Sequence, residues 1–331
     1  MQNFELTILG CSSATPTSTR NPSAQLLNIA ERFFLIDCGE ATQIQLRKYK
    51  IKFQRINHIF ISHLHGDHYL GLMGLLSSMH LLGRTTEMHL YCPAELEEII
   101  ELQNKYSRTV FHFNIIFHPH KYIANDLIFE DEKVVVRTIL LNHRIPCCGF
   151  LFTEKPLLAN ISKEILKKYH VPVEQILEIK KGADFITSEG ELIPNNELVS
   201  NKFKPRSYAY CSDTCYDERI IELIHGVDLL YHEATFMNDR LSRAIETFHS
   251  TTLQAATIAQ KAQVLKLMIG HYSARYKDLQ PLLDEAKTIF NNTILAREGE
   301  SIIIDSITSS QNIPSEDSVE DQHTSKTEVQ R

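Results

Sequence analysis

The sequence lacks the features that would place the protein in a membrane or outside the cell. No apolar run among its 331 residues approaches the length of a membrane-spanning helix. The N-terminal stretch MQNFE lacks the basic and then apolar start of a secretion signal. The seven cysteines contain no CxxC pair, which favours reduced thiols over a disulfide framework. We therefore expect a cytoplasmic protein with no membrane partner.

The composition is otherwise that of an ordinary soluble globular protein. Hydrophobic residues make up 43% and charged residues 23%, and the length suits one large domain or two small ones. The net charge is −7, but −3 of it belongs to residues 309–331, which have few aliphatic side chains. Such a segment cannot bury enough apolar surface to offset the entropy of ordering, so we expect a disordered acidic tail. The remaining body is only mildly acidic, so net charge does not exclude a nucleic-acid substrate.

The most informative stretch is SHLHGDH at residues 62–68, directly after the apolar, β-branched residues 56–61. The apolar run predicts a buried strand, and three histidines and one aspartate follow its end. Burying such side chains costs free energy unless they are paired, and neighbouring imidazoles repel one another once they are protonated. A divalent cation removes both costs, because neutral imidazole and ionised carboxylate are its ordinary ligands. A metal site is therefore favoured over a polar loop with chance histidines.

The spacing within this stretch predicts two metal ions. In an extended segment His63 and His65 point to the same side, so they can bind one ion together. After the turn at Gly66, Asp67 and His68 lie at a neighbouring position and can bind a second ion.

Possible metal ligands also follow the apolar runs at 134–141, 208–211 and 265–269. The end of a strand is held rigidly by its sheet, while the adjoining loop is free to carry chemistry. A lone histidine or aspartate after a strand is more often a cap or turn residue, but here three recur together with the first cluster. Five histidines and two aspartates suit two ions bridged by one carboxylate, which we assign to Asp213. The predicted ligands are His63, His65, Asp67, His68, His143, Asp213 and His271.

The first third of the chain reads as strands alternating with helices. Apolar runs predict strands at 4–9, 32–37 and 87–92. Helices are predicted at 40–50, 71–82 and 94–106. Strands followed by helices around one sheet system indicate an α/β fold.

Local strings in the sequence resemble those of a known family. The pattern HLHGDH with the downstream ligands is similar to that of the metallo-β-lactamase fold. Within that fold, four further strings resemble the ribonuclease Z family, whose members trim the 3′ trailer from precursor tRNA. These strings are DCGEATQ (37–43), HEATF (232–236), HSTT (249–252) and GHYSARY (270–276). Matching strings extend from about residue 4 to residue 305, which is nearly all of the chain outside the predicted tail.

The resemblance implies a structure and an activity. It implies a catalytic domain over residues 1–308 with a four-layer αββα sandwich, two zinc ions per chain and a homodimer. The implied reaction is hydrolysis of one phosphodiester in precursor tRNA, which leaves a 3′-hydroxyl on the tRNA and a 5′-phosphate on the trailer.

The implied chemistry assigns roles to four residues. Two bound cations make water a nucleophile near neutral pH and neutralise charge on the phosphate. Asp67, within the metal cluster, is the candidate general base. Glu233 and His249 lie in the matched strings and are candidates for holding and supplying the proton that the departing ribose oxygen needs. Arg275 could bind phosphate through its planar guanidinium.

The resemblance also implies an inserted arm that grips the tRNA elbow, here at about residues 154–203. The segment contains a predicted helix at 162–169 and no long apolar run. Residues 155–206 include nine basic and seven acidic residues, with Lys180 and Lys181 as candidate tRNA contacts. A solvated surface insertion would have a similar composition. The Gly-Pro pair that is usual in this arm is absent, and the corresponding region reads VPVE at 171–174.

Two other classes of function fit parts of the pattern. A different hydrolase of the same fold, acting on small molecules, would share the metal ligands but would not need the inserted segment. A non-catalytic RNA-binding member of the fold would have lost metal ligands, whereas all seven positions are filled here.

Overall fold

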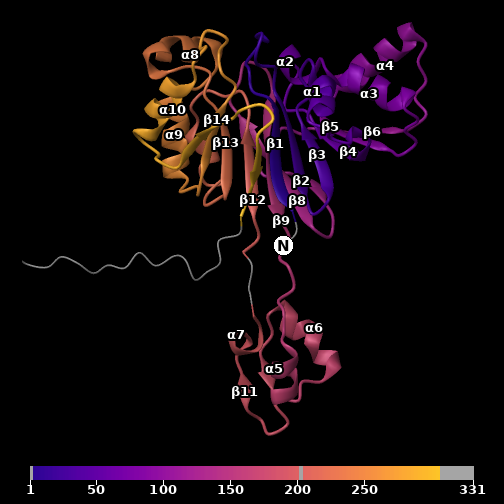
Figure 1. The fold of residues 1–331 in the computed structure, drawn as a ribbon, viewed down its shortest axis with the longest axis vertical. Coiled ribbons are helices and arrows are strands. Elements are labelled where there is room, and N and C mark those ends of the chain that lie inside the picture. The colour runs from indigo at the N-terminus through magenta and orange to yellow at the C-terminus, as the bar shows by residue number, and fades with distance from the viewer. Residues whose placement is uncertain (1–2, 201–203, 306–331) are drawn as a thin grey trace, which may run out of the picture. The chain divides into compact units, whose positions relative to one another are not determined.

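The computed structural model describes residues 3–200 and 204–305, which form two compact units (Figure 1). The larger unit consists of the chain up to Pro156 together with Pro205–Ser306, and the smaller unit contains Leu157–Lys204. The acidic tail predicted at residues 309–331 lies outside the described residues.

The first sheet of the larger unit has seven strands in the order β16-β1-β2-β3-β4-β5-β6. Strands β3 to β6 pair in parallel, whereas the pairs from β16 to β3 are antiparallel. The bounds are β1 Phe4–Gly10, β2 Ala24–Ile29, β3 Arg32–Ile36, β4 Ile56–Phe60, β5 Met88–Cys92, β6 Ile115–Pro119 and β16 Ser301–Ile303.

The second sheet also has seven strands, in the order β15-β14-β13-β12-β9-β8-β7. Strands β12 to β15 pair in parallel, and the pairs from β7 to β12 are antiparallel. The bounds are β7 Leu127–Glu130, β8 Val134–Leu141, β9 Cys147–Glu154, β12 Ser207–Cys211, β13 Leu229–Glu233, β14 Leu267–Gly270 and β15 Thr293–Leu295. The parallel strands deliver their carboxyl ends to one edge of this sheet.

The helices of the larger unit lie outside the two sheets. They are α1 Thr42–Lys48, α2 Gly66–Tyr69, α3 Leu72–Leu81, α4 Glu95–Ser107, α8 Leu241–Thr247, α9 Thr252–Lys261 and α10 Gln280–Lys287. Short 3-10 helices cover Phe53–Arg55, Glu218–Ile220 and Asn238–Arg240.

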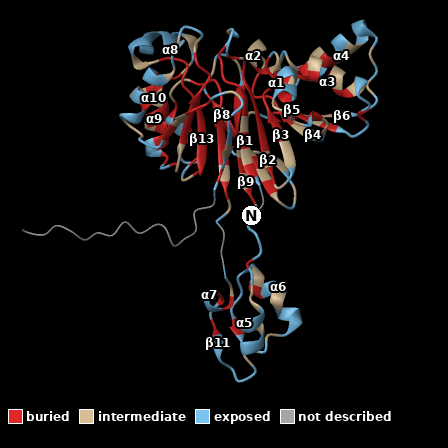
Figure 2. Ribbon diagram, in the orientation of Figure 1, coloured by how far each residue is buried: buried red, intermediate tan, exposed pale blue. Residues whose placement is uncertain are grey.

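Apolar side chains join these elements into four layers. Between the sheets, the ring of Phe60 on β4 lies 5.4 Å from that of Phe150 and 5.3 Å from that of Phe152, both on β9. Leu46, Leu75 and Leu96, from α1, α3 and α4, belong to a second cluster with the first sheet. Helix α9 contacts β13, β14 and α10 on the other side. The central strands of both sheets are accordingly mostly buried (Figure 2), and the predicted α/β sandwich is confirmed.

The start of α9 explains part of the HSTT string. Thr251 is the N-cap residue, and its Oγ1 accepts a hydrogen bond from the backbone N–H of Gln254 at 3.3 Å. The Gln254 side chain accepts in return from the backbone N–H of Thr251 at 3.0 Å. This capping box satisfies two backbone donors at the helix end. It fixes the position of the loop that carries His249.

The smaller unit is a separate small fold. It contains α5 Lys163–Lys168, α6 Val173–Lys181 and α7 Asn195–Leu198, with a hairpin of β10 Phe185–Ile186 and β11 Leu192–Ile193. The side chains buried at its centre are Ile179, Phe185, Ile193 and Leu198. Helix α5 occupies most of the predicted helix at 162–169, and Ser162 caps it by accepting from the backbone N–H of Ile165 at 3.2 Å.

All seven cysteines have free thiols, and six of them are buried. Burial raises the pKa of the Cys38 thiol to about 12. It also raises the pKa of the Cys211 thiol well above the ordinary range. The buried cysteines are therefore protonated packing residues. No helix in the described part of the chain is both long and apolar enough to cross a membrane.

Candidate metal centre

The predicted metal-binding stretch runs from the end of β4 into α2. His65 has an extended backbone (φ −73°, ψ 143°) and is the N-cap residue of α2, so Asp67 and His68 lie in the first helical turn. The chain beyond α2 lies against the β3–α1 loop, because a Cβ on Gly71 would be 2.0 Å from the carbonyl oxygen of Gly39. Only glycine permits this close approach, which positions the turn.

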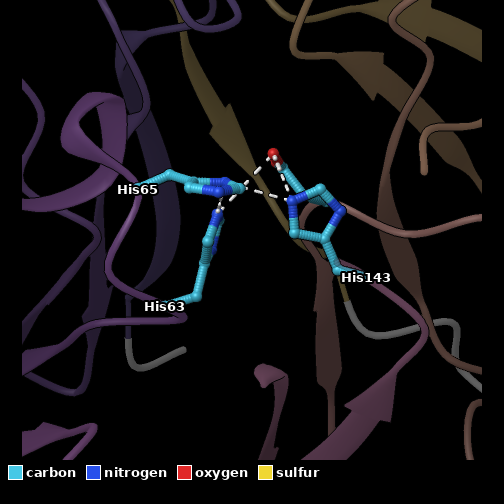
Figure 3. Close-up of side chains that lie close together, drawn as sticks. His63, His65 and His143 are labelled. Atoms are coloured by element: carbon cyan, nitrogen blue, oxygen red, sulfur yellow. Dashed lines mark hydrogen bonds and ion pairs between the residues drawn. The ribbon is translucent and has the colours of Figure 1, made fainter. Parts of the chain in front are cut away.

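Three histidines form a first ligand group with Asp213. His65 Nδ1 lies 3.0 Å from His63 Nε2 and 3.1 Å from His143 Nε2. Asp213 Oδ2 lies 3.7 Å from Nε2 of both His63 and His143. Figure 3 shows the three histidines pointing toward one another. Zinc–nitrogen bonds of about 2.0–2.1 Å in a tetrahedron separate two nitrogen ligands by about 3.3 Å, so this donor set fits a zinc-sized ion.

A second ligand group shares Asp213. Its Oδ1 lies 3.2 Å from Nε2 of both His68 and His271. Asp67 Oδ2 lies 3.3 Å from the same two nitrogen atoms. Because Oδ2 of Asp213 faces the first group and Oδ1 faces the second, this carboxylate lies where a bridging ligand would.

Backbone and carboxylate acceptors set the proton positions of two ligand histidines. His143 Nδ1 donates to the carbonyl oxygen of Phe248 at 2.9 Å, and His68 Nδ1 donates to Asp37 Oδ2 at 2.7 Å. Each bond fixes the proton on Nδ1 and leaves the lone pair of Nε2 directed at the ligand groups. Such outer acceptors are typical of histidines that bind metal ions.

Hydroxyl groups accept hydrogen bonds from the Nδ1 atoms of His63 and His271. Ser62 Oγ donates to Asp37 Oδ2 at 3.0 Å, so it accepts from His63 Nδ1 at 3.0 Å. Thr235 Oγ1 donates to Glu233 Oε2 at 2.8 Å, so it accepts from His271 Nδ1 at 2.9 Å. The Nε2 lone pairs of both histidines therefore also face the ligand groups.

The electrostatics of His68 favour a cation. Burial lowers the pKa of His68, but the carboxylates of Asp213, Asp67 and Asp37 outweigh burial and raise it well above its ordinary value. Within the described structure His68 Nε2 has no hydrogen-bond partner, although carboxylate oxygens of Asp67 and Asp213 lie within 3.3 Å. Two carboxylates directed at His68 Nε2 require positive charge at that point, which a proton or a bound cation supplies.

Glu233 and His249 form a third group beside the second. His249 Nδ1 donates to Glu233 Oε1 at 2.8 Å. Glu233 is fully buried, and its Oε2 accepts from the backbone N–H of Thr235 at 3.0 Å. Burial lowers the pKa of His249, but the Glu233 carboxylate outweighs this effect and raises it to about 9. His249 is therefore a protonated donor at neutral pH.

The three groups open into a pocket of about 420 Å³. The ligands His65, Asp67, His143, Asp213 and His271 line it together with His249. The remaining lining includes Pro16, Glu40 and Arg144 from loops and Thr247 from the end of α8. A substrate in this pocket would contact both the ligand groups and the His249 donor.

The structure thus brings together all seven predicted ligands, Glu233 and His249, but it places three other predicted residues elsewhere. Arg275 is not among the described residues that line the pocket. Its Nε donates to Ser273 Oγ at 3.1 Å, and its guanidinium lies 5.1 Å from the centre of the Phe236 ring. Lys180 and Lys181 lie in the last turn of α6, in the smaller unit.

Sequence reasoning missed the supporting roles of Asp37 and Thr235. Asp37 follows the apolar strand β3, which is the same signal that identified the ligands. Thr235 is two residues past Glu233 in the HEATF string. Neither residue belongs to a candidate ligand group, and each acts through its hydrogen bond to a histidine, which the sequence does not show.

Comparison with known proteins relates the whole chain to one group of enzymes. The chain is 50% identical over 307 residues to the ribonuclease Z of Phocaeicola vulgatus. The aligned region covers 93% of this chain and 99% of that protein. The crystal structure of human tRNase Z, short form (ELAC1), is 28% identical, has a TM-score of 0.66 and covers 91% of this chain and 99% of that one.

Two further matches concern the fold. The metallo-β-lactamase fold protein YhfI from Bacillus subtilis is 18% identical, has a TM-score of 0.65 and covers 91% of this chain and 100% of that one. A family model described as anti-Pycsar protein Apyc1 matches residues 4–160. The predicted metallo-β-lactamase fold is therefore confirmed.

Proposed function

The chain belongs to the ribonuclease Z family, and we propose that it is a zinc-dependent endoribonuclease that removes the 3′ trailer from precursor tRNA. The reaction hydrolyses one phosphodiester and leaves a 3′-hydroxyl on the tRNA and a 5′-phosphate on the trailer. The matched region covers 93% of the chain, so the assignment concerns the catalytic domain as a whole and not an isolated motif.

The observation that supports this activity best is the pair of ligand groups joined by Asp213. His63, His65 and His143 would hold one zinc ion, and Asp67, His68 and His271 would hold the other. When bound, two zinc ions neutralise charge on a phosphate and make water a nucleophile near neutral pH. The donor set fits this chemistry, because the histidines direct ring nitrogens at the two ligand groups and the carboxylates of Asp67 and Asp213 are ionised.

Asp67 is the residue proposed to accept a proton from the attacking water. Burial opposes ionisation of Asp67, but the charge of His68 and hydrogen bonds with His271 and His68 lower its pKa far below the ordinary value. The ionised carboxylate lines the pocket, so it is in reach of a water molecule there. It can orient that water and receive its proton.

His249 is proposed to supply a proton to the departing ribose oxygen. Its pKa of about 9 keeps it protonated at neutral pH, and it lines the same pocket as Asp67. Glu233 holds the imidazolium in place through the 2.8 Å bond to Nδ1, which leaves Nε2–H for the substrate. The proposed general base, Asp67, and the proposed general acid, His249, are thus different residues.

The smaller unit is proposed to be the tRNA-binding arm inserted in a catalytic domain of residues 1–308. Lys163, Lys167, Lys168 and Lys181 are exposed on α5 and α6, while Lys180 is half-buried. These ammonium groups suit contacts with the phosphate backbone of tRNA. Such contacts position the RNA but do not read its sequence. Arg275 is proposed to contact the substrate outside the pocket.

We also propose a homodimer in the cytoplasm. Exposed apolar side chains occur toward the ends of α3 and α4, where Leu81 is 81% exposed, Tyr106 78% and Val110 80%. Large exposed apolar side chains that gather in one region mark interaction surfaces. Sedimentation of the purified protein would test the dimer directly. The free thiols fit a reducing compartment.

The direct test of the activity uses a precursor tRNA labelled at its 5′ end and a small phosphodiester, bis(p-nitrophenyl) phosphate. The proposal expects one major cut at the 3′ side of the tRNA, with a 3′-hydroxyl on the labelled product. A chelator should abolish the cut and zinc should restore it. Hydrolysis of the small ester with the precursor left intact would favour the small-molecule hydrolase instead.

A further inference from the structure

His65 differs from the other ligand histidines in what its outer ring nitrogen faces. Its Nδ1 points into the first ligand group, and its Nε2 lies 3.4 Å from Arg144 Nη2. The outer nitrogens of His63, His68, His143 and His271 each donate to an oxygen acceptor. A guanidinium carries only donors, so Arg144 cannot play that part for His65.

Metal binding at Nδ1 makes this difference consequential. A neutral imidazole whose Nδ1 lone pair binds a cation must carry its proton on Nε2. Nε2–H of His65 and the N–H groups of Arg144 then face each other as donors. An anion between them would accept from both groups, and it would supply the outer acceptor that metal-binding histidines normally have.

Arg144 is well placed to bind such an anion. It follows His143 in the chain, its side chain is exposed, and it lines the same pocket as the ligands. Among the described residues of that lining, it is the only arginine or lysine. Glu40 also lines the pocket, but no ion pair joins it to Arg144 in the described structure. His65 is the one partner recorded for the Arg144 guanidinium within residues 3–200 and 204–305.

We propose that Arg144 and the Nε2–H of His65 form a clamp for a non-bridging oxygen of a phosphodiester adjacent to the scissile one. The inference rests on the proposed function. The imidazole ring of His65 separates the clamp from the ligand atoms, so the clamped oxygen lies on the far side of the ring from the attacked phosphorus. The planar guanidinium matches a phosphate with two oxygens, and the charge strengthens each hydrogen bond.

The clamp acts on binding and positioning, so its test measures equilibrium binding. The probe is precursor tRNA whose scissile linkage is a methylene phosphonate, which keeps the charge but lacks the bond that is broken. Two further probes also carry one neutral methylphosphonate, at the linkage on the 5′ side or on the 3′ side. The proteins are wild type, Arg144→Ala, Arg144→Lys and, as a matched control, Arg219→Ala, which removes an exposed guanidinium outside the pocket.

Arg144→Ala should weaken binding of the charged probe by about tenfold or more, the usual effect of losing hydrogen bonds to a charged group. At one of the two adjacent linkages, the neutral methylphosphonate should weaken binding to wild type as much as Arg144→Ala weakens binding of the charged probe. The same methylphosphonate should hardly change binding to Arg144→Ala. Arg144→Lys should recover part of the affinity, and Arg219→Ala should resemble wild type. Zinc content should be two per chain in every variant.

The clamp would be overturned if, at both adjacent linkages, the losses of affinity caused by the methylphosphonate and by Arg144→Ala were additive. Loss of zinc from Arg144→Ala would also overturn it, because it would show a structural role for Arg144. Equal weakening by Arg219→Ala would reduce the effect to net charge and would also overturn it. These results differ from failure of the proposed function, in which wild type itself would neither bind nor cleave precursor tRNA.

Discussion

The Asp37 carboxylate accepts the Nδ1–H of His68 at 2.7 Å, with both side chains fully buried. Asp37 also accepts from the backbone N–H of Ser62 at 2.8 Å and from the Tyr210 hydroxyl at 2.6 Å. Ser62 follows a strand of the first sheet, and Tyr210 lies on β12 of the second. Groups from both sheets therefore fix the orientation of one ligand histidine.

Asp37→Asn should weaken zinc binding by about 10- to 100-fold, as is usual for loss of such an outer partner. An asparagine can offer an acceptor to His68 only by turning its NH₂ group toward other donors. Competition with a fluorescent zinc chelator measures the affinity. Asp217→Asn is the matched control, since Asp217 is a nearly buried aspartate that pairs with Arg219 away from the ligands. Unchanged zinc affinity in Asp37→Asn would contradict the orienting role.

Asp67→Ala should lower the rate of precursor cleavage by at least about 10²–10⁴-fold, because it removes a proposed zinc ligand that is also the proposed proton acceptor. The variant should fold, since Asp67 lies in the first turn of the short helix α2 and not in the core. Circular dichroism and single-turnover cleavage check both statements. Asp239→Ala, at an exposed aspartate, should behave as wild type. Near-normal cleavage by folded Asp67→Ala would assign the base to another group.

The pH dependence of cleavage should report His249. The protonated form is the proposed acid, so activity should fall as the pH rises through the pKa of about 9. Glu233 raises that pKa, and Glu233→Gln removes its charge. The alkaline limb of the single-turnover profile should therefore move to lower pH in Glu233→Gln.

The control for this shift is His249→Ala, which should lose the alkaline limb and most of the rate at neutral pH. A more labile leaving group, such as p-nitrophenol, needs no proton and should be released by His249→Ala at a rate closer to that of wild type. An alkaline limb that stays in place in Glu233→Gln would show that another group controls it.

Neutral replacement of Lys163, Lys167, Lys168, Lys180 and Lys181 should weaken binding of precursor tRNA, while hydrolysis of bis(p-nitrophenyl) phosphate stays unchanged. Each lost phosphate contact should reduce the slope of log affinity against log salt by about 0.7–0.9. Filter binding at several salt concentrations measures this slope. The same replacement at Lys121 and Lys261, in the larger unit, should leave it unchanged. Normal tRNA binding with lost ester hydrolysis would contradict an arm role.

The candidate ligands could be selected from the sequence because most of them follow a strand within a few residues. The apolar runs before His63, His143 and His271 correspond to β4, β8 and β14, and side-chain chemistry then limits what their ends can bind. The helix predicted at 71–82 is α3, at Leu72–Leu81, with one residue less at each end. Local patterns suffice where local forces decide the structure.

Other features depend on contacts between distant segments. Asp37 meets Tyr210 across 173 positions of sequence, and no local pattern contains that bond. The insertion was expected from about residue 154, whereas Glu154 ends β9 and bonds to Arg206 in the larger unit. The outward Nε2 of His65 and its neighbour Arg144 likewise follow from the packing of two loops. The proposal for this pair therefore depends on the three-dimensional structure.

The most direct test of the two-metal account is zinc titration of the metal-free protein, with single-turnover cleavage of precursor tRNA measured at each point. Asp213 joins the two ligand groups, so neither ion alone completes the centre. Cleavage should rise only toward two equivalents of zinc per chain and then stay constant. Full activity at one equivalent, or activity in protein shown to contain no metal, would contradict the account.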